Sequence, residues 1–233
     1  LGVFYITKSI MEAPEYDNLR KKFKITPGLK GKKFIVQGFG NVGYWYSKFM
    51  VEAGAILVGV TEWSGSVYNP QGIDIKTFKK HHDANKGDKL DSYTGAKFLK
   101  ADEAMYQECD IFVPAALEQA INKNNAAKFK CKLIVEAANG ATTVRGDEIL
   151  NQRGILVVPD ILANAGGVTC SYFEWLKNLD HRRPGRMTKK WEEVSKAHLI
   201  EGLQNGLDKA GIKVDLSVFI FKIDNRSQTD KRR

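Results

Sequence analysis

The sequence predicts an α/β fold with a doubly wound, mostly parallel sheet and a C-terminal helical extension. Five short apolar runs alternate with segments of helical periodicity, the order expected of a parallel sheet covered by helices. The runs are almost continuously apolar, as strands buried on both faces require. A glycine-rich turn directly follows the first run. The predicted strands cover residues 34–37, 56–60, 111–113, 133–135 and 155–158.

Helices are predicted before and between these strands. The first one stops at Pro14, because the residue before a proline disfavours helical backbone. The second opens on the glycine turn and closes at Gly54, and the third starts with Asp74 as a capping residue. We expect the polar stretch 84–97 to be a surface loop. The predicted helices cover residues 3–13, 41–53, 74–83 and 102–107.

Two longer helices are predicted towards the C-terminus, over residues 164–179 and 189–209. An apolar stripe on the first is expected to pack in a core. Residues 216–223 form a strand-like run, and a basic tail follows. The predicted division is a sheet domain over 1–185 and a partial helix with an unaligned tail over 186–233. The stripes hold Tyr172, Phe173, Trp175, Leu176 and Leu179 on the first helix, and Trp191, Val194, Leu199, Leu203 and Leu207 on the second.

The composition is that of an ordinary globular protein and excludes several functional classes. Of the 233 residues, 43% are hydrophobic and 27% are charged. No apolar run reaches the roughly 18 residues of a membrane span, so no membrane partner is predicted. The net charge of +9 gathers at the two ends of the sequence around a nearly neutral centre. Without a clustered basic face or a known motif, this charge is interpreted as solvated surface or contacts to an acidic partner, and no nucleic-acid partner is predicted.

Cysteine usage favours a reducing compartment. Cys109, Cys131 and Cys170 are odd in number and lie far apart among apolar neighbours, so we predict buried, reduced thiols. The four histidines lack metal-ligand spacing, and no metal site is predicted. The start of the chain has no secretory signal pattern. It opens on Leu1 instead of Met, so we expect the chain to begin partway through a gene product.

A G-x-G-x-x-G pattern stands between the first predicted strand and the next helix. There Gly38 permits a tight turn, Gly40 lets the backbone approach a pyrophosphate, and Gly43 lets the helix pack close to the strand. Free N–H groups at the helix start would meet the diphosphate charge. Glu62 ends the second strand, where a carboxylate binds ribose hydroxyls and repels a 2′-phosphate, although an acid at a strand end is also compatible with plain surface. The pattern predicts a Rossmann-like domain and favours NAD, with NADP as the alternative.

Longer motifs resemble glutamate dehydrogenase, and the resemblance covers roughly residues 2–209. Residues 186–188 and the charged helix after them resemble the rising helix of the antenna in the hexameric animal and protist enzymes. The motifs that occur in the family's order and spacing are FIVQGFGNVG, GSVYNPQGID, CDIFVPAA, IVEAANGATT and VVPDILANAGGVTCSYFEWLKN.

The resemblance implies a reversible oxidative deamination. L-glutamate would pass a hydride to the nicotinamide, and the imine would be hydrolysed to 2-oxoglutarate and ammonia. Taken alone, each asparagine of the site would more readily be an Asx turn or a cap. The residues implied are Gly38, Phe39, Gly40, Asn41, Val42 and Gly43 at the pyrophosphate, Glu62 at the adenosine ribose, Ala115 and Ala116 along the dinucleotide, Asn139 and Asn164 near the nicotinamide ribose and carboxamide, and Val168 and Ser171 facing the substrate, with Ser171 at its side-chain carboxylate.

Some positions depart from the family pattern. Ala137 and Ala141 stand where the family usually has glycine and proline, and Leu1 stands in the place of an arginine. A methyl group at position 137 would crowd the backbone if that residue needed a positive φ. The lysines and the aspartate that bind glutamate and move protons belong, in the family, to a domain N-terminal to this segment. No catalytic residue is therefore predicted here, and binding of L-glutamate or 2-oxoglutarate would need that further domain.

Two interpretations remain open. The chain is the dinucleotide-binding domain of a working glutamate dehydrogenase, or it is a non-catalytic module derived from one that serves as a binding or structural subunit. Both predict association with other chains, as an oligomer or in a larger assembly. The family resemblance favours the mitochondrial matrix, with the cytoplasm as the alternative.

Overall fold

The computed structural model describes residues 1–180, 189–209 and 211. It divides into two compact units, Leu1–Cys170 and Ser171–Arg233. The strand predicted at 216–223 and the domain limit predicted at 185/186 lie outside the described residues. The predicted domain division therefore stays a prediction.

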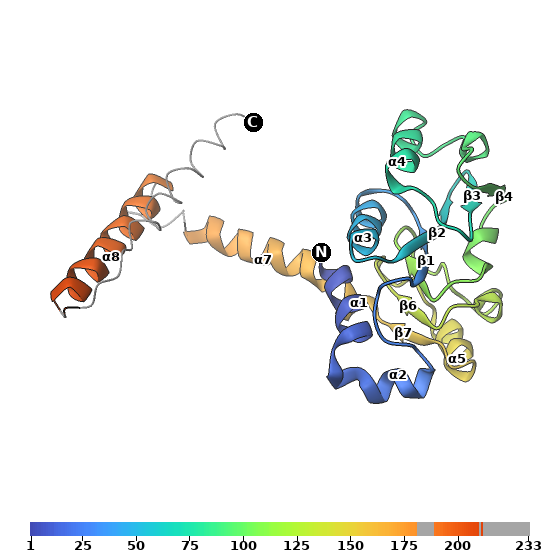
Figure 1. Cartoon of the computed structure of the whole chain (residues 1–233), viewed down its shortest axis with the longest axis horizontal. Coiled ribbons are helices and arrows are strands. Elements are labelled where there is room, and N and C mark those ends of the chain that lie inside the picture. Colours follow the sequence, from blue (N-terminus) through green and yellow to red (C-terminus); the bar gives the residue numbers. More distant parts are fainter. Residues whose placement is uncertain (181–188, 210, 212–233) are drawn as a thin grey trace. The chain divides into compact units, whose positions relative to one another are not determined.

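The first unit is built on one seven-stranded sheet, with strand order β4-β3-β2-β1-β5-β6-β7 (Figure 1). Five strands run parallel to one another, and β3 and β4, which pair antiparallel, form one edge. The predicted α/β class with a mostly parallel sheet is confirmed. The parallel strands are β1 (Lys33–Gln37), β2 (Ile56–Glu62), β5 (Ile111–Pro114), β6 (Leu133–Val135) and β7 (Leu156–Val158), and the antiparallel ones are β3 (Gly65–Tyr68) and β4 (Lys97–Leu99).

The parallel strands are apolar in their middle positions because side chains of each strand enter two hydrophobic cores. In β1, Phe34 and Val36 belong to one core and Ile35 to the other. In β5 the same alternation separates Val113 from Phe112. Successive side chains of a strand point to opposite faces, so a strand covered on both sides needs consecutive apolar residues along its buried middle.

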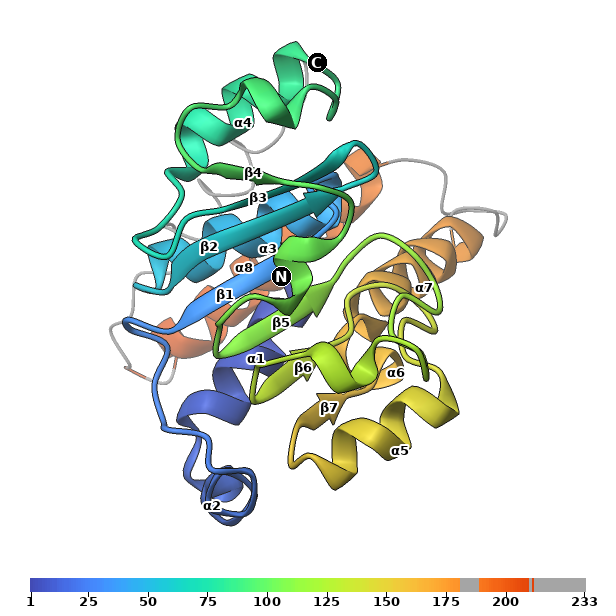
Figure 2. The same ribbon diagram turned by 90° about the vertical axis from the view of Figure 1, so that its right-hand side faces the viewer.

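Helices cover both faces of this sheet (Figure 2). Met11, Tyr46 and Phe78 anchor one layer in the first core, and Met105 and Phe129 anchor the opposite layer in the second. The first layer consists of α1 (Gly2–Glu12), α3 (Asn41–Glu52) and α4 (Ile75–Ala84), and the second holds α5 (Val144–Gln152) with the short 3-10 helices η3 (Glu103–Tyr106) and η4 (Ala126–Lys128). The remaining helices of the unit are η1 (Pro14–Tyr16), α2 (Asp17–Phe23), η2 (Leu90–Ser92) and α6 (Asp160–Ala163).

The structure corrects the prediction at the antiparallel edge. Strands β3 and β4 were not predicted, because each is short and neither is an apolar run of the kind that marks the parallel strands. The surface loop predicted at 84–97 is wrong, since Leu90 and Tyr93 are buried. Tyr93 packs edge-on against Phe78, with ring centroids 5.0 Å apart. The helix predicted at 102–107 is the 3-10 helix η3.

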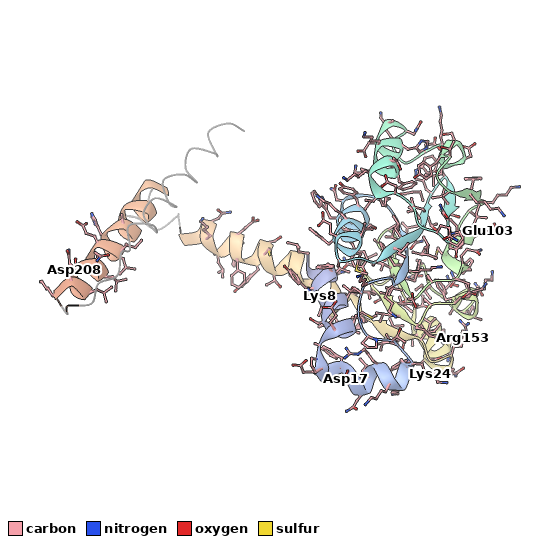
Figure 3. The ribbon with its side chains drawn as sticks, viewed as in Figure 1. Lys8, Asp17, Lys24, Glu103, Arg153 and Asp208 are labelled. Atoms are coloured by element: carbon pink, nitrogen blue, oxygen red, sulfur yellow. The ribbon has the colours of Figure 1, made fainter. Side chains whose placement is uncertain are left out.

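The N-terminal basic flank is only partly solvated surface. Lys8, Asp17 and Lys24 are exposed, and Figure 3 shows their side chains on α1, on α2 and just after α2. Arg20, by contrast, is buried, pairs with Asp17 and donates to the carbonyl of Ile10 at 2.6 Å. This arginine therefore fastens α2 to α1, and it is not available to an acidic partner.

Only some of the cysteines are buried as predicted. Cys131 is buried and Cys109 is half-buried, and the two side chains are hydrogen-bonded to one another. That bond and burial raise the pKa of the Cys109 thiol. Cys170 is exposed on α7, so the prediction of a buried thiol is wrong there. All three are free thiols.

The second unit contains most of α7 (Ala165–Asp180) and all of α8 (Lys189–Lys209). The apolar stripe predicted to pack in a core is exposed: Phe173 is 61% exposed, and Trp175 is 54% exposed. On α8, Leu199 and Leu203 are also exposed. Periodicity predicts which side chains share a helix face, but it does not reveal whether another element covers that face. No helix among the described residues is long and apolar enough to cross a membrane.

Candidate functional site

The predicted cofactor residues gather where the strand order reverses. From β1 the chain crosses through α3 to β2 on one side, whereas β5, β6 and β7 lie on the other. Ligands of doubly wound sheets bind outside the carboxyl ends of the strands at such a switch point. The turns after β1 and β5, residues 38–40 and 115–116, face each other there.

Close backbone packing fixes the glycine turn. Gly38 has a φ of 84°, and a Cβ on it would lie 2.8 Å from the Ala116 Cβ and 3.1 Å from the Ala115 carbonyl oxygen. A Cβ on Gly43 would lie 1.9 Å from the Gly38 carbonyl oxygen. Real Cβ atoms do not approach a backbone oxygen so closely, so α3 can begin directly beside β1 only because both positions are glycine.

The start of α3 is open to a ligand. Gly40 is its N-cap residue, and a Cβ built there would meet nothing within 4 Å. No side chain caps the helix, and Asn41 and Val42 in its first turn are exposed. The first N–H groups of a helix have no partner inside the helix and carry partial positive charge. This geometry fits a pyrophosphate, which would bring acceptor oxygens and negative charge.

Phe39 differs from its glycine neighbours in that its side chain belongs to the core. It is 1% exposed and packs edge-on against Phe78, with ring centroids 4.8 Å apart. Its backbone N–H donates to Glu62 Oε1 at 2.5 Å. Phe39 thus holds the turn down on α4, and the N–H that a ligand would otherwise use is already engaged.

Glu62 lies at the carboxyl end of β2, next to the glycine turn. Its side chain is 14% exposed. Besides the Phe39 N–H, its Oε1 faces Nε2 of His82 on α4 at 3.2 Å. Both contacts use Oε1, so within the described part of the chain Oε2 is the oxygen left for a ligand.

The two predicted asparagines meet on the other side of the switch point. Asn164 Nδ2 donates to Asn139 Oδ1 at 2.7 Å and to the Ala137 carbonyl at 3.4 Å. Asn139 follows β6, and Asn164 follows α6. Because the two side-chain amides lie side by side, a cofactor ribose or carboxamide placed here could meet both of them.

A carboxylate network supports this asparagine pair. Glu136 is buried, and its Oε2 accepts from the Asp160 N–H at 3.0 Å. The Asp160 side chain in turn accepts from the Gly140 N–H at 2.7 Å. Ala137 is not among the positive-φ residues, and its backbone N–H donates to the Pro114 carbonyl at 3.0 Å. The methyl group in place of the family's usual glycine therefore causes no backbone strain.

Buried oxygens without partners mark the same edge of the sheet. Gln37 Oε1, Thr61 Oγ1 and Glu136 Oε1 are buried and make no hydrogen bond among the described residues. They lie at or just beyond the carboxyl ends of β1, β2 and β6. Buried polar atoms are nearly always satisfied, so this edge suits a polar ligand or ordered water.

Three site residues were not predicted from the sequence. Glu136 and Asp160 lie inside recognised motifs, and their positions within two residues of the ends of β6 and β7 are the signal that could have found them. His82 has no such signal, because its contact with Glu62 depends on how α4 packs. The described residues contain no group of three His, Cys, Asp or Glu side chains that could hold a metal ion.

The two predicted substrate residues lie on α7. Val168 is 70% exposed in the first unit. Ser171 is exposed and belongs to the second unit. Their roles towards a substrate stay predictions.

Comparison with known proteins gives consistent matches. The profile of the glutamate/leucine/phenylalanine/valine dehydrogenase family matches residues 1–204. The mitochondrial glutamate dehydrogenase of Dictyostelium discoideum is 46% identical over 224 residues, which are 96% of this chain and 44% of that protein. An NADP-specific glutamate dehydrogenase of Saccharolobus shibatae is 47% identical, over 66% of this chain and 36% of the relative. The NAD-specific enzyme of Bacillus subtilis is 47% identical, over 64% and 34%.

Solved structures agree with these matches. The crystal structure of glutamate dehydrogenase from Peptoniphilus asaccharolyticus superposes with a TM-score of 0.55 at 30% identity and covers 99% of this chain and 51% of that one. The chain spans less than half the length of the curated relatives it matches.

Proposed function

Because the chain belongs to the glutamate/leucine/phenylalanine/valine dehydrogenase family, we propose that it is the nicotinamide-dinucleotide-binding part of a glutamate dehydrogenase. The resemblance to glutamate dehydrogenase predicted from the sequence is confirmed at the level of the family. One observation carries the proposal. The uncapped start of α3 lies at the switch point, beside an open Gly40, on a turn that only glycines at 38 and 43 allow.

The proposed residue roles follow from this geometry. The first turn of α3 binds the pyrophosphate, with Gly40 leaving room for its approach. Glu62 Oε2 accepts hydrogen bonds from the adenosine ribose. The Asn139–Asn164 pair binds the nicotinamide ribose and carboxamide.

The proposed reaction is the oxidative deamination of L-glutamate to 2-oxoglutarate and ammonia. The bound nicotinamide supplies the hydride acceptor. This chain's own residues hold the two ends of the dinucleotide at the edge of the sheet, and the fixed turn at 38–43 sets their position. The groups that bind glutamate and transfer protons are proposed to come from a further domain, so turnover needs more than these residues.

We propose NAD as the cofactor, with NADP as the alternative, because relatives of both specificities match the chain. A carboxylate at the end of β2 favours NAD, since it binds a ribose diol and repels a 2′-phosphate. We propose the mitochondrial matrix as the location, because the Dictyostelium relative is named as a mitochondrial enzyme. Association with other chains is proposed from the exposed apolar side chains of α7, and light scattering would test it.

Calorimetric titration with NADH tests the proposal. Saturable binding is expected. Failure to bind any nicotinamide dinucleotide would remove the cofactor role and favour the non-catalytic module.

The Asn164→Ala variant separates the two ends of the site. It removes the bond to Asn139, so it should weaken NADH binding about tenfold while leaving the affinity for ADP, which lacks both the nicotinamide and its ribose, unchanged. Asn151→Ala is the matched control, because Asn151 is an exposed residue of α5 bonded to Asp147. An equal loss for both ligands would contradict the placement of the nicotinamide.

A further inference from the structure

His82 contacts Glu62 although no motif assigns it a role. It lies near the end of α4, with its Nε2 3.2 Å from Glu62 Oε1. Both side chains are 14% exposed, so water screens the contact little. The position is therefore suited to control how Glu62 meets a ligand.

The imidazole is held in place from several sides. It packs against Phe39, with ring centroids 5.5 Å apart, and against Phe78 at 6.3 Å. A Cβ on Gly87 would come 3.1 Å from Nε2, so the loop after α4 closes over the ring. The charged groups that face it are Glu62 at Nε2 and Asp83, whose Oδ1 lies 3.7 Å from Nδ1. With so little freedom, the ring fixes the carboxylate that it contacts.

We propose that His82 is a specificity-determining residue that sharpens the preference for a coenzyme without a 2′-phosphate. The inference rests on the proposed cofactor role of the site. The Phe39 N–H and His82 both hold Glu62 Oε1, so the carboxylate cannot turn away from the ribose. A fixed carboxylate keeps both its hydrogen bonds to a ribose diol and its repulsion of a phosphate. A carboxylate held only by the backbone contact could rotate aside and admit the phosphate.

The test is the ratio of the NADPH and NADH dissociation constants, measured by fluorescence titration of the full chain. His82→Leu removes the contact and should lower this ratio about tenfold, the size expected when a hydrogen bond to a charged group is lost. His82→Gln keeps a donor near the position of Nε2 and should restore most of the ratio. His81→Leu is the matched control, because His81 lies next in the same helix but contacts the Lys89 carbonyl and Tyr93.

A double-mutant cycle identifies the route of the effect. In a Glu62→Gln background the added His82→Leu change should leave the ratio within about twofold, since the charge that His82 positions is gone. An unchanged ratio in His82→Leu, an equal loss of affinity for both coenzymes, or a further tenfold fall in the Glu62→Gln background would overturn the inference. A higher ratio would do so too, because it would make His82 a ligand of the phosphate. If the unaltered chain binds neither coenzyme, the proposed function itself fails.

Discussion

The two halves of the candidate site lie on one edge of the same sheet but are built in different ways. The glycine turn, residues 38–43, is shaped by backbone atoms that approach more closely than any side chain would allow. The asparagine pair, Asn139 with Asn164, is held by side-chain hydrogen bonds between segments more than 20 residues apart. The first half depends on the absence of side-chain atoms from its glycines, and the second depends on which side chains are present.

This difference predicts how each half fails. A steric fit fails as soon as one carbon atom is added at Gly38 or Gly43, because the neighbouring backbone must then shift. A hydrogen-bonded pair fails gradually, because neighbouring bonds and water replace part of what is lost. Substitutions in the two halves should therefore change the free energy of unfolding and the ligand affinity in different proportions.

The largest effect is expected at Gly43. In Gly43→Ala the new methyl group would lie 1.9 Å from the Gly38 carbonyl oxygen and 2.9 Å from its carbon, so α3 must shift away from β1. We expect a loss of about 3 kcal/mol in the free energy of unfolding, at the upper end for overpacking, together with loss of NADH binding. Urea denaturation followed by circular dichroism measures the first, and NADH fluorescence the second.

Gly40→Ala is the matched control for that change. Position 40 has a φ of −69° and open space around it, so the free energy of unfolding should change by less than about 0.5 kcal/mol. Its methyl group would nevertheless occupy the approach of the pyrophosphate, so NADH affinity should still fall. A Gly40→Ala variant that binds NADH normally would show that no diphosphate lies against this turn.

An intermediate effect is expected in the asparagine half, at Glu136. Glu136→Ala leaves the Asp160 N–H without its acceptor and should lower the free energy of unfolding by about 1–3 kcal/mol. NADH binding should weaken more than ADP binding, because the loosened loop carries Asn139 and ADP lacks the nicotinamide and its ribose. The control is Glu148→Ala on α5, which removes only an exposed pair with Arg145 and should cost little. If both ligands lose affinity equally, the two halves are mechanically coupled and the contrast between them is wrong.

The same contrast explains what could be predicted from the sequence. The parallel strands and the glycine turn were predictable, because burial on both faces and steric exclusion leave their marks on consecutive residues. Strands β3 and β4 were missed, since short strands at the edge of a sheet need no apolar run. Asn139 and Asn164 were predicted only through the family resemblance, and His82 was not predicted, because pairing across distant segments has no local pattern. The exposed stripe of α7 shows the converse. Its periodicity is clear, but periodicity does not identify what packs against the stripe.

The smallest effect is expected at Asp74, the N-cap of the helix that carries His82. Its carboxylate accepts from the Thr77 N–H at 2.7 Å, and this bond lowers the pKa of Asp74. Asp74→Ala should cost about 1 kcal/mol of unfolding free energy at neutral pH, as for other capping residues. Because the folded pKa is lowered, the charged cap contributes stability above the unfolded pKa of about 3.9 and loses it as pH falls through the folded value. The difference in unfolding free energy between the unaltered chain and Asp74→Ala, measured by urea denaturation, should therefore shrink towards pH 3.

Asp74→Asn is the control for this pH dependence. It keeps a cap acceptor without a titrating group, so its difference from Asp74→Ala should not follow the pH. NADH affinity should change by less than about twofold in both variants, since an exposed cap lies away from the ligand. A larger change would mean that the glycine half also depends on side chains, through α4 and its contact with Glu62.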